Sequence, residues 1–256
     1  MSRISEAFKN KKVFIPFITG GDPDIETTRK ILYALNEAGA GIIEIGIPFS
    51  DPIAEGPVIQ EASQRALAAG TTTDSLFELV KEVRADIKIP ILFMTYANVV
   101  YKYGAEKFAK KCNECGIDGM IIPDVPYEEK AEFAEVCKNH NLDFISMIAP
   151  TSKDRIQMIA SEAEGFIYCV SSMGVTGVRT GFSNNLDEMI KSVREVTDVP
   201  VAIGFGISTP EQAATMAALS DGAIVGSAIV RIIAEHGTNA PAAVKEYVTK
   251  MVQAIK

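Results

Sequence analysis

Residues 200 to 226 read PVAIGFGISTPEQAATMAALSDGAIVG, and this stretch indicates the fold class of the chain. Its two apolar runs, PVAIGF (200–205) and GAIVG (222–226), flank a segment in which Thr209 and Pro210 signal the start of a helix. Because the runs are continuously apolar rather than alternating, they predict strands buried on both faces, as in a parallel sheet that helices cover. The stretch therefore predicts a strand, a helix and a second, parallel strand.

The same alternation of apolar run and helical pattern continues along the chain. The runs expected to form strands cover residues 13–18, 41–45, 90–95, 119–124, 143–149, 165–170, 200–205 and 222–226. Between them, Asp24 and Asp74 are placed to begin helices, and Gly39, Gly70 and Gly116 are placed to end them. Eight strand and helix units in about 250 residues predict an α/β fold of the (β/α)8 type, the TIM barrel.

The alternative architecture is an open, doubly wound sheet, because the alternation of strands and helices does not by itself prove closure. A dinucleotide-binding sheet of that type has a G-x-G-x-x-G turn after its first strand, whereas residues 18–23 read ITGGDP. The barrel is therefore favoured. No linker or low-complexity tract divides the chain, so we expect a single domain over residues 1–256 with a short N-terminal helix.

The composition disfavours several classes of function. The 256-residue chain is 47% apolar and carries a formal net charge of −8, which is unfavourable for binding a nucleic-acid backbone. Its N-terminus, MSRISEAFKNKK, lacks the apolar core of a signal peptide, and no apolar run approaches the ~18 residues of a membrane helix. We therefore expect a cytoplasmic protein that binds neither nucleic acid nor membrane.

Neither a metal site nor a covalent lysine is predicted. Cys112 and Cys115 have C-x-x-C spacing, but they lie at the end of an amphipathic helix pattern without further ligands, so we interpret them as ordinary helix-end residues. His140 and His236 fall away from the carboxyl ends of the predicted strands, where a barrel gathers its functional groups. No lysine follows a strand either, which disfavours a Schiff-base aldolase.

Two glutamates lie at the second predicted strand and in the loop after it. Glu44 interrupts the apolar run GIIEIGIP, where burial would raise its pKa and suit it for giving and taking protons. A structural carboxylate that accepts hydrogen bonds from backbone N–H groups fits this position equally well. Glu55 follows in FSDPIAEGP, a turn stiff enough to hold it across the barrel mouth from Glu44; a solvated loop glutamate is the alternative.

The loops after the last two predicted strands are suited to binding phosphate. Residues 204–209 read GFGIST, and residues 226–230 read GSAIV and open a helix. Small residues at a helix N-terminus leave backbone N–H groups free for an anion, although flexible turns without a ligand would read the same way. Residues 171–185 lack apolar periodicity and are expected to form a lid, in which Arg179 either contacts phosphate or is solvated.

Longer motifs in the chain resemble those of the tryptophan synthase alpha subunit family. They are PFITGGDP (16–23), EIGIPFSDPIAEGPVIQ (44–60), TYANVV (95–100), PDVPYEE (123–129), SSMGVTG (171–177) and GFGISTPEQ (204–212). The resemblance implies a carbon–carbon lyase that cleaves indole-3-glycerol phosphate to indole and glyceraldehyde 3-phosphate without a cofactor of its own. It also implies a beta subunit partner, which uses pyridoxal phosphate, in an alpha-beta-beta-alpha complex.

The resemblance also implies roles for individual residues. Glu44 matches the acid/base glutamate of the family, and Tyr168 matches a tyrosine close to it. The positions that match substrate contacts are Phe17, Tyr96, Asp124, Thr176 and Phe205. The positions that match phosphate contacts are Gly177, Gly206, Gly226 and Ser227. The positions that match the docking surface for the beta subunit are Pro48, Asp51, Pro52 and Asn98.

One residue departs from the family pattern. The position matched by Glu55 is usually aspartate, whose carboxylate binds the indole N–H group. The extra methylene of glutamate moves the oxygens by ~1 Å or more, and a displacement of that size can cost on the order of 100-fold in rate. Either the loop compensates for the longer side chain or the activity is low. The sequence alone leads us to expect that Glu55→Asp keeps or raises activity.

Three other functions remain open at this point. The chain could be a stand-alone lyase that releases free indole. It could also be a weakly active subunit that mainly activates a beta subunit, which the departure at Glu55 makes conceivable. An unrelated phosphosugar isomerase on the same barrel is the most distant alternative, because it would not need the motif at residues 44–60.

Overall fold

The strands observed in the structure coincide with the eight predicted apolar runs. The computed structural model describes residues 2–170, 183–204 and 206–256. Its strands are β1 (Val13–Thr19), β2 (Ile43–Gly46), β3 (Ile91–Met94), β4 (Gly119–Ile121), β5 (Asp143–Phe144), β6 (Ser146–Ile148), β7 (Ile167–Val170), β8 (Val201–Gly204) and β9 (Gly222–Val225). The predicted run 143–149 accounts for both β5 and β6, which Ile145 separates.

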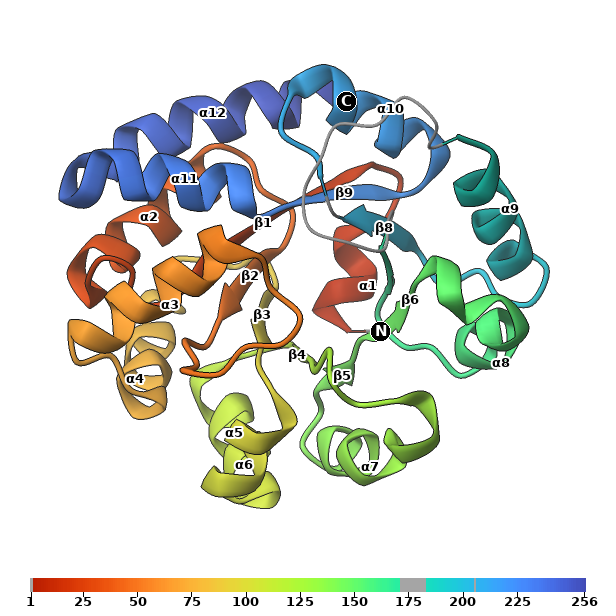
Figure 1. The fold of residues 1–256 in the computed structure, drawn as a ribbon, viewed down its shortest axis with the longest axis horizontal. Helices are drawn as coiled ribbons and strands as arrows, with labels where there is room; N and C mark the ends of the chain where they lie inside the picture. Colours follow the sequence, from red (N-terminus) through yellow and green to blue (C-terminus); the bar gives the residue numbers. More distant parts are fainter. Residues whose placement is uncertain (1, 171–182, 205) are drawn as a thin grey trace.

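The sheet closes on itself at this interrupted strand. The strand order is β5-β4-β3-β2-β1-β9-β8-β7-β6, and every recorded pair is parallel. β5 pairs with β4, whereas β6, one residue further along the chain, pairs with β7. Because the two ends of the sheet are consecutive parts of one strand, the structure is a TIM barrel and not an open sheet (Figure 1).

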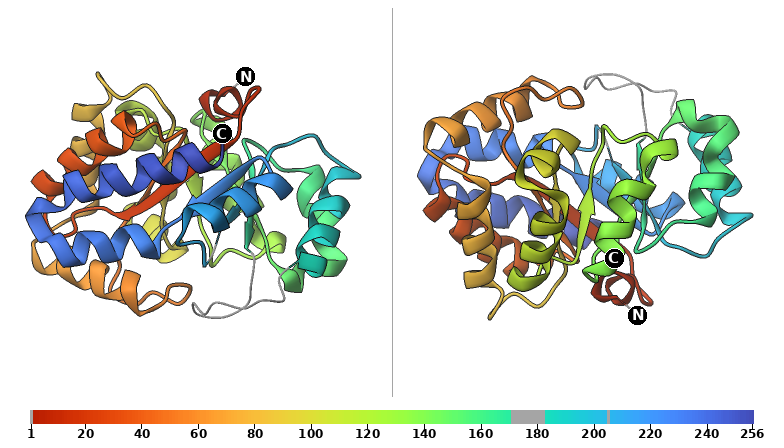
Figure 2. Two further views of the ribbon diagram at one scale, coloured as in Figure 1. Left: turned by 90° about the horizontal axis from the view of Figure 1, so that it is seen from above. Right: turned by 90° about the horizontal axis from the view of Figure 1, so that it is seen from below.

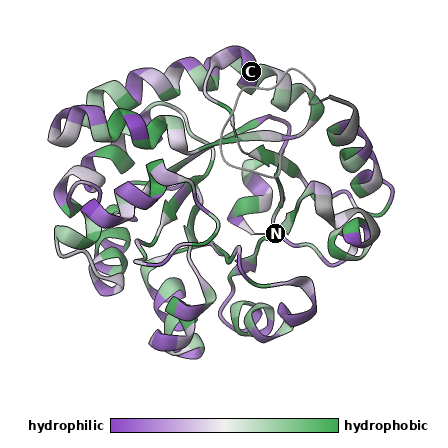
Figure 3. Cartoon of the chain, in the orientation of Figure 1, coloured by the Kyte–Doolittle hydropathy of each residue, from purple (hydrophilic) through white to green (hydrophobic). Residues whose placement is uncertain are grey.

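Helices surround the barrel and cover the outer face of its strands (Figure 1). The α-helices are α1 (Arg3–Ala7), α2 (Ile25–Glu37), α3 (Pro57–Ala68), α4 (Thr73–Val83), α5 (Ala97–Tyr103), α6 (Ala105–Cys115), α7 (Ala131–Asn139), α8 (Ile156–Ser161), α9 (Ser183–Arg194), α10 (Pro210–Leu219), α11 (Ser227–His236) and α12 (Ala240–Ala254). Three 3₁₀ turns are η1 (Tyr127–Glu129), η2 (Pro150–Arg155) and η3 (Gly237–Asn239). Figure 3 shows hydrophobic strands in the centre and helices that alternate between hydrophilic and hydrophobic residues, as amphipathic covering helices do.

Most of the predicted helix boundaries are confirmed, and one N-cap was assigned wrongly. Asp24 caps α2 by accepting a hydrogen bond of 2.6 Å from the Thr27 N–H group. Asp74, predicted to start the next helix, instead lies in the first turn of α4, which Thr72 caps together with Ser75. A hydroxyl two residues earlier makes the reciprocal bonds of a capping box, so the carboxylate is not needed as the cap. The three predicted glycines follow the ends of α2, α3 and α6.

The apolar core has two layers. One lies between the strands and the covering helices, and the other fills the barrel interior with side chains such as Ile15, Leu92 and Ile224. The predicted N-terminal helix, α1, belongs to the inner layer: Ile4 has no exposed surface, and the Phe8 ring lies 5.6 Å from that of Phe166. Figure 2 shows α1 at one end of the barrel and the loop between β2 and α3 at the other. The short helix therefore covers the amino-terminal end of the barrel.

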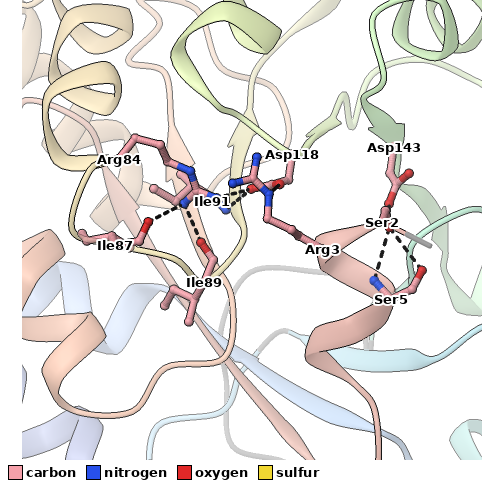
Figure 4. Close-up of polar contacts among 9 residues, drawn as sticks. All are labelled: Ser2, Arg3, Ser5, Arg84, Ile87, Ile89, Ile91, Asp118 and Asp143. Carbon is pink, nitrogen blue, oxygen red and sulfur yellow. Dashed lines mark hydrogen bonds and ion pairs between the residues drawn. The ribbon is translucent and has the colours of Figure 1, made fainter.

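Polar contacts attach this N-terminal segment to the barrel (Figure 4). Asp118, just before β4, accepts hydrogen bonds from Arg3 Nε at 2.6 Å, Arg84 Nη2 at 3.1 Å and the Ile91 N–H group at 2.9 Å. The Ser2 hydroxyl donates to Asp143 at the start of β5. The N-terminus is thus held to the edge of the barrel opposite the loop that carries Glu55. Among the described residues, no helix combines the length and hydropathy needed to cross a bilayer.

Candidate active site

A cavity of about 250 Å³ lies at the carboxyl ends of the strands. Its lining includes Glu44, Glu55 and Tyr168, together with residues of the loops after β8 and β9. The two carboxylates and the two small-residue loops, which are far apart in the sequence, therefore share one cavity at the end of the barrel where (β/α)8 enzymes carry their active sites.

Glu44 is the most deeply buried charged group of this cavity. It lies on β2 in register with Phe17 of β1 and Leu92 of β3, and its exposed surface is 0%. Neither of its carboxyl oxygens has a hydrogen-bond partner among the described residues. Burial raises the pKa of Glu44 from 4.5 to about 8, because the charged form loses its hydration. The described residues thus give no support to the alternative of a carboxylate held by backbone N–H groups.

Tyr168 reaches the same cavity from β7. Its side chain lies across Gly204 of β8 so closely that a Cβ atom at residue 204 would come within 2.6 Å of the phenol oxygen. Burial raises the pKa of Tyr168 well above its ordinary value, and the charge of Glu44 raises it further. The phenol therefore stays protonated and is available only as a neutral hydrogen-bonding group.

Glu55 lies in the loop between β2 and α3, where a tyrosine holds it. The Tyr96 hydroxyl donates a hydrogen bond to Glu55 Oε2 and accepts hydrogen bonds from the N–H groups of Ile53 at 3.0 Å and Ala54 at 2.8 Å. Partial burial raises the pKa of the Glu55 carboxyl, and the hydrogen bond from Tyr96 acts in the opposite direction. The alternative of a freely solvated loop glutamate does not fit these contacts.

Tyr96 and Asp124 lie behind the cavity wall instead of lining it. Tyr96 is 3% exposed and contacts the loop of Glu55. The Asp124 carboxylate accepts hydrogen bonds of 3.0 and 3.3 Å from the Ala97 N–H group at the start of α5. That both residues contact substrate, as the resemblance implies, stays a prediction. Both side chains fix elements that border the cavity.

The part of the cavity that the loops after β8 and β9 line is suited to an anion. Gly206, Gly226 and Ser227 line it, as the sequence predicts, and Gly226 precedes the first turn of α11 without a side-chain cap. The φ of Gly206 is +75°, a conformation that glycine adopts without strain. The first N–H groups of α11 have no partner within the helix, and the helix dipole adds positive potential at the same place. Arg231, one turn along α11, also lines the cavity.

Comparison with known proteins identifies the family. The family model described as "Tryptophan synthase alpha chain" matches residues 4–256. The chain belongs to the tryptophan synthase alpha chain family. It is 49% identical over 253 residues to the tryptophan synthase alpha chain of Lacticaseibacillus casei, covering 99% of this chain and 95% of that one. The tryptophan synthase alpha subunit structure from Legionella pneumophila str. Paris is 36% identical with a TM-score of 0.90, over 100% of this chain and 98% of that one.

Membership of the tryptophan synthase alpha family confirms the resemblance drawn from the motifs. It gives the chain a lyase role in tryptophan synthesis, with a small-molecule substrate and a beta subunit as partner. The stand-alone lyase, the activator and the phosphosugar isomerase are not favoured by this result.

Several residues of the cavity were not predicted from the sequence. The apolar wall includes Met94 at the end of β3, Met147 on β6 and Ile224 on β9. Each lies in a predicted apolar run, but only the register of the closed barrel shows which side chains of a run face inward. Arg231 was also missed, because a lone cation in a helix normally indicates a solvated face. The sequence feature that could have identified it is its position four residues after Ser227, which places both residues on the same face of α11.

Three predicted tryptophan synthase contacts lie outside the described residues. These are Thr176, Gly177 and Phe205. Arg179 and most of the predicted lid, residues 171–182, also lie outside them. Phe17, by contrast, lines the cavity from β1, as the resemblance implies.

The residues that match the docking surface differ in exposure. Asp51 and Asn98 are exposed and Pro52 is partly exposed, whereas Pro48 is buried. The neighbouring Ile53 is 80% exposed, the highest value among the large hydrophobic side chains described as exposed. Except for Pro48, these residues can reach a partner chain directly.

The side chains of His140, Cys112 and Cys115, which were not expected to act in catalysis, lie away from the cavity. His140 Nε2 lies 2.8 Å from Glu106 on the outer surface, and Cys112 and Cys115 are in the last turn of α6, as predicted. Burial raises the pKa of both thiols, so they are poor nucleophiles. Within the part of the chain that the structure describes, no group of three or more His, Cys, Asp or Glu side chains could hold a metal ion.

Proposed function

We propose that this chain cleaves indole-3-glycerol phosphate to indole and glyceraldehyde 3-phosphate, as the alpha subunit of a tryptophan synthase. The observation that carries the proposal is the burial of Glu44, without a partner among the described residues, in the same cavity as the N-terminus of α11. A proton carrier and an anion site in one cavity match a substrate that carries both an indole ring and a phosphate.

The reaction needs no electron sink from the protein. Glu44, neutral near its pKa of about 8, gives its proton to indole C3, and the ring becomes a positively charged indoleninium ion with a C=N bond. The resulting carboxylate takes the proton of the hydroxyl on the adjacent side-chain carbon. The bond between that carbon and C3 breaks, its electrons restore the indole ring, and the aldehyde forms. The net change moves one proton from the hydroxyl to C3.

The other groups of the cavity bind and orient the substrate. Glu55 accepts a hydrogen bond from the indole N–H group and stabilises the positive charge that develops on the ring during protonation. Tyr168, which stays protonated, donates to the ionised form of Glu44. Phe17, Met94 and Met147 provide the apolar surface for the ring. The backbone N–H groups at the start of α11 and at Gly206 bind the phosphate.

We propose further that pyridoxal phosphate is held only by the beta subunit, in a cytoplasmic alpha-beta-beta-alpha complex. The exposed side chains of Asp51, Ile53 and Asn98, at the same end of the barrel as the cavity, are suited to contact that partner. Docking on the loop that carries Glu55 would link partner binding to the geometry of the site. Indole formed in the cavity would then pass to the beta subunit.

Indole release from indole-3-glycerol phosphate, measured with and without an added beta subunit, tests this function. Cleavage that the beta subunit strongly stimulates is the expected result. High turnover without the partner would identify a stand-alone lyase. No cleavage in either assay, together with normal stimulation of the beta reaction, would identify an activator and overturn the proposal.

A further inference from the structure

The Tyr96 hydroxyl uses its full hydrogen-bonding capacity on the loop of Glu55. Its proton is donated to Glu55 Oε2, and its two lone pairs accept the N–H groups of Ile53 and Ala54. One side chain thereby fixes both the backbone of the loop and the carboxylate that the loop carries. The main-chain oxygen of Glu55 is held separately, by Gln60 Nε2 at 2.8 Å.

Tyr96 is itself held from three sides. Its ring is 3% exposed and lies 5.3 Å from the ring of Phe49. Its backbone precedes the first residue of α5, and the Ala97 N–H group beside it donates to Asp124 in the loop after β4. A side chain fixed by packing and by a capped helix can in turn fix a catalytic group.

We propose that Tyr96 is the positioning residue that enables this chain to use glutamate at residue 55. The proposal rests on the proposed function, in which Glu55 receives the indole N–H group. Because Oε2 is engaged by Tyr96, Oε1 is the oxygen left for the substrate. The contact depends on the length of the glutamate, since an aspartate side chain would end ~1.5 Å short of the tyrosine. We therefore expect Glu55→Asp to lower activity, the opposite of the expectation from the sequence.

The hydrogen bond also affects the protonation of Glu55. The titratable and charged groups around Glu55 are Tyr96, Asp124, Glu44, Tyr168 and Arg231, from five different parts of the barrel. Burial and the charge of Asp124 raise the pKa of Glu55, and the hydrogen bond from Tyr96 lowers it. Loss of the hydroxyl therefore raises the pKa of Glu55. As the pH is lowered, the cleavage rate of the variant then begins to fall at a higher pH than that of wild type.

Tyr96→Phe tests the proposal, and Tyr103→Phe is its matched control. Tyr103 is the last residue of α5, the helix that Tyr96 precedes, and its hydroxyl also donates to a carboxylate, that of Asp74 at 2.6 Å, but outside the cavity. We expect Tyr96→Phe to lower kcat about 10- to 100-fold and to raise the acid-side pKa of the rate profile. Tyr103→Phe leaves both unchanged. In the Glu55→Asp background, Tyr96→Phe lowers kcat by less than about a further twofold, because the hydrogen bond between residues 96 and 55 is already absent.

A direct titration separates this proposal from the cleavage reaction. The ¹³C signal of the Glu55 carboxyl, assigned by its absence in Glu55→Gln, reports the pKa of that group without substrate. A higher pKa in Tyr96→Phe supports the positioning role even if the chain fails to cleave indole-3-glycerol phosphate. An unchanged pKa overturns it even if the cleavage reaction is verified.

Circular dichroism shows whether Tyr96→Phe folds. If it does not fold, Glu55→Asp tests the proposal instead. That variant removes the hydrogen bond between Tyr96 and residue 55 and leaves the aromatic packing of Tyr96 intact. Cleavage by Glu55→Asp at the wild-type rate would then overturn the proposal, and a drop of about tenfold or more would support it.

Discussion

Glu44 on β2 and Tyr168 on β7 face the same cavity from different sides of the barrel, and the charge of the glutamate raises the pKa of the tyrosine. In the proposed reaction, the phenol donates a hydrogen bond to the ionised form of Glu44. We expect Tyr168→Phe to lower kcat about tenfold and to change KM little, since the donor acts after Glu44 has given up its proton. Steady-state indole release measures both. Tyr33→Phe, which removes a surface hydroxyl bonded to Asp86, should leave them unchanged.

Glu44→Gln is the most direct test of the proton carrier. Glutamine has nearly the same shape but cannot exchange a proton, so we expect a loss of about 10²- to 10⁴-fold in kcat while the fold is retained. Single-turnover cleavage of indole-3-glycerol phosphate provides the measurement, with circular dichroism as the check on folding. If the variant keeps most of its activity, proton transfer must be assigned to another group.

The raised pKa of Glu44 also predicts how stability depends on pH. The folded protein holds the proton up to about pH 8, whereas the ordinary value of the group is 4.5, so the folded state binds more protons between these values. The unfolded chain releases this proton at a lower pH than the folded protein does. The free energy of unfolding therefore falls as the pH rises through this window, by a few kcal/mol in total. Glu44→Gln lacks this penalty.

Urea unfolding at about pH 5, 7 and 9 compares the two proteins. We expect Glu44→Gln to gain stability relative to wild type as the pH increases, and to differ least at the lowest pH. Other ionisable groups affect both proteins alike and cancel in the difference. If the two proteins differed in free energy of unfolding by the same amount at all three pH values, ionisation of Glu44 would carry no cost in the folded state.

The fold, the buried carboxylate and the small-residue loops of the cavity could be predicted from the sequence, because each leaves a local signal. Continuous apolar runs identify buried parallel strands, and Glu44 is visible as an ionisable residue inside one of them. The positions of Tyr96 and Asp124 behind the wall could not be predicted, since they depend on the path of three loops that are far apart in the sequence. Arg231 was missed because its position in the cavity lining depends on how α11 packs at the mouth of the barrel, although its spacing from Ser227 can be read in the sequence.

Arg231 is the one cationic side chain in the described lining of the cavity, which also carries two glutamates. A dianionic phosphate at the start of α11 would be attracted by it, and helical side chains point back toward the N-terminus. Because Arg231 is exposed, we expect Arg231→Gln to raise KM for indole-3-glycerol phosphate about 5- to 10-fold, with kcat retained and the difference reduced at high salt. Arg155→Gln, which breaks a surface pair with Glu128, is the control. A KM equal to that of wild type would assign the phosphate to the backbone alone.

The last prediction concerns the amino-terminal end of the barrel. Asp118 is nearly buried and accepts hydrogen bonds from Arg3, Arg84 and the Ile91 N–H group. The Arg84 side chain is only 11% exposed, so loss of Asp118 leaves a mostly buried cation without its carboxylate. We expect Asp118→Ala to lower the free energy of unfolding by about 3 kcal/mol. Arg3→Ala should cost about 1 kcal/mol or less, because the Arg3 side chain is 51% exposed.

Urea unfolding of the two variants distinguishes a buried anchor from a set of surface contacts. Equal losses of unfolding free energy in Asp118→Ala and Arg3→Ala would mean that the exposed Arg3 contact, and not burial of the Asp118 carboxylate, accounts for the stabilisation. Cleavage at saturating substrate should be retained in both variants, since Asp118 lies before β4 and the cavity opens at the carboxyl ends of the strands. A fall in kcat with the fold intact would show instead that the two ends of the barrel are coupled through its interior side chains.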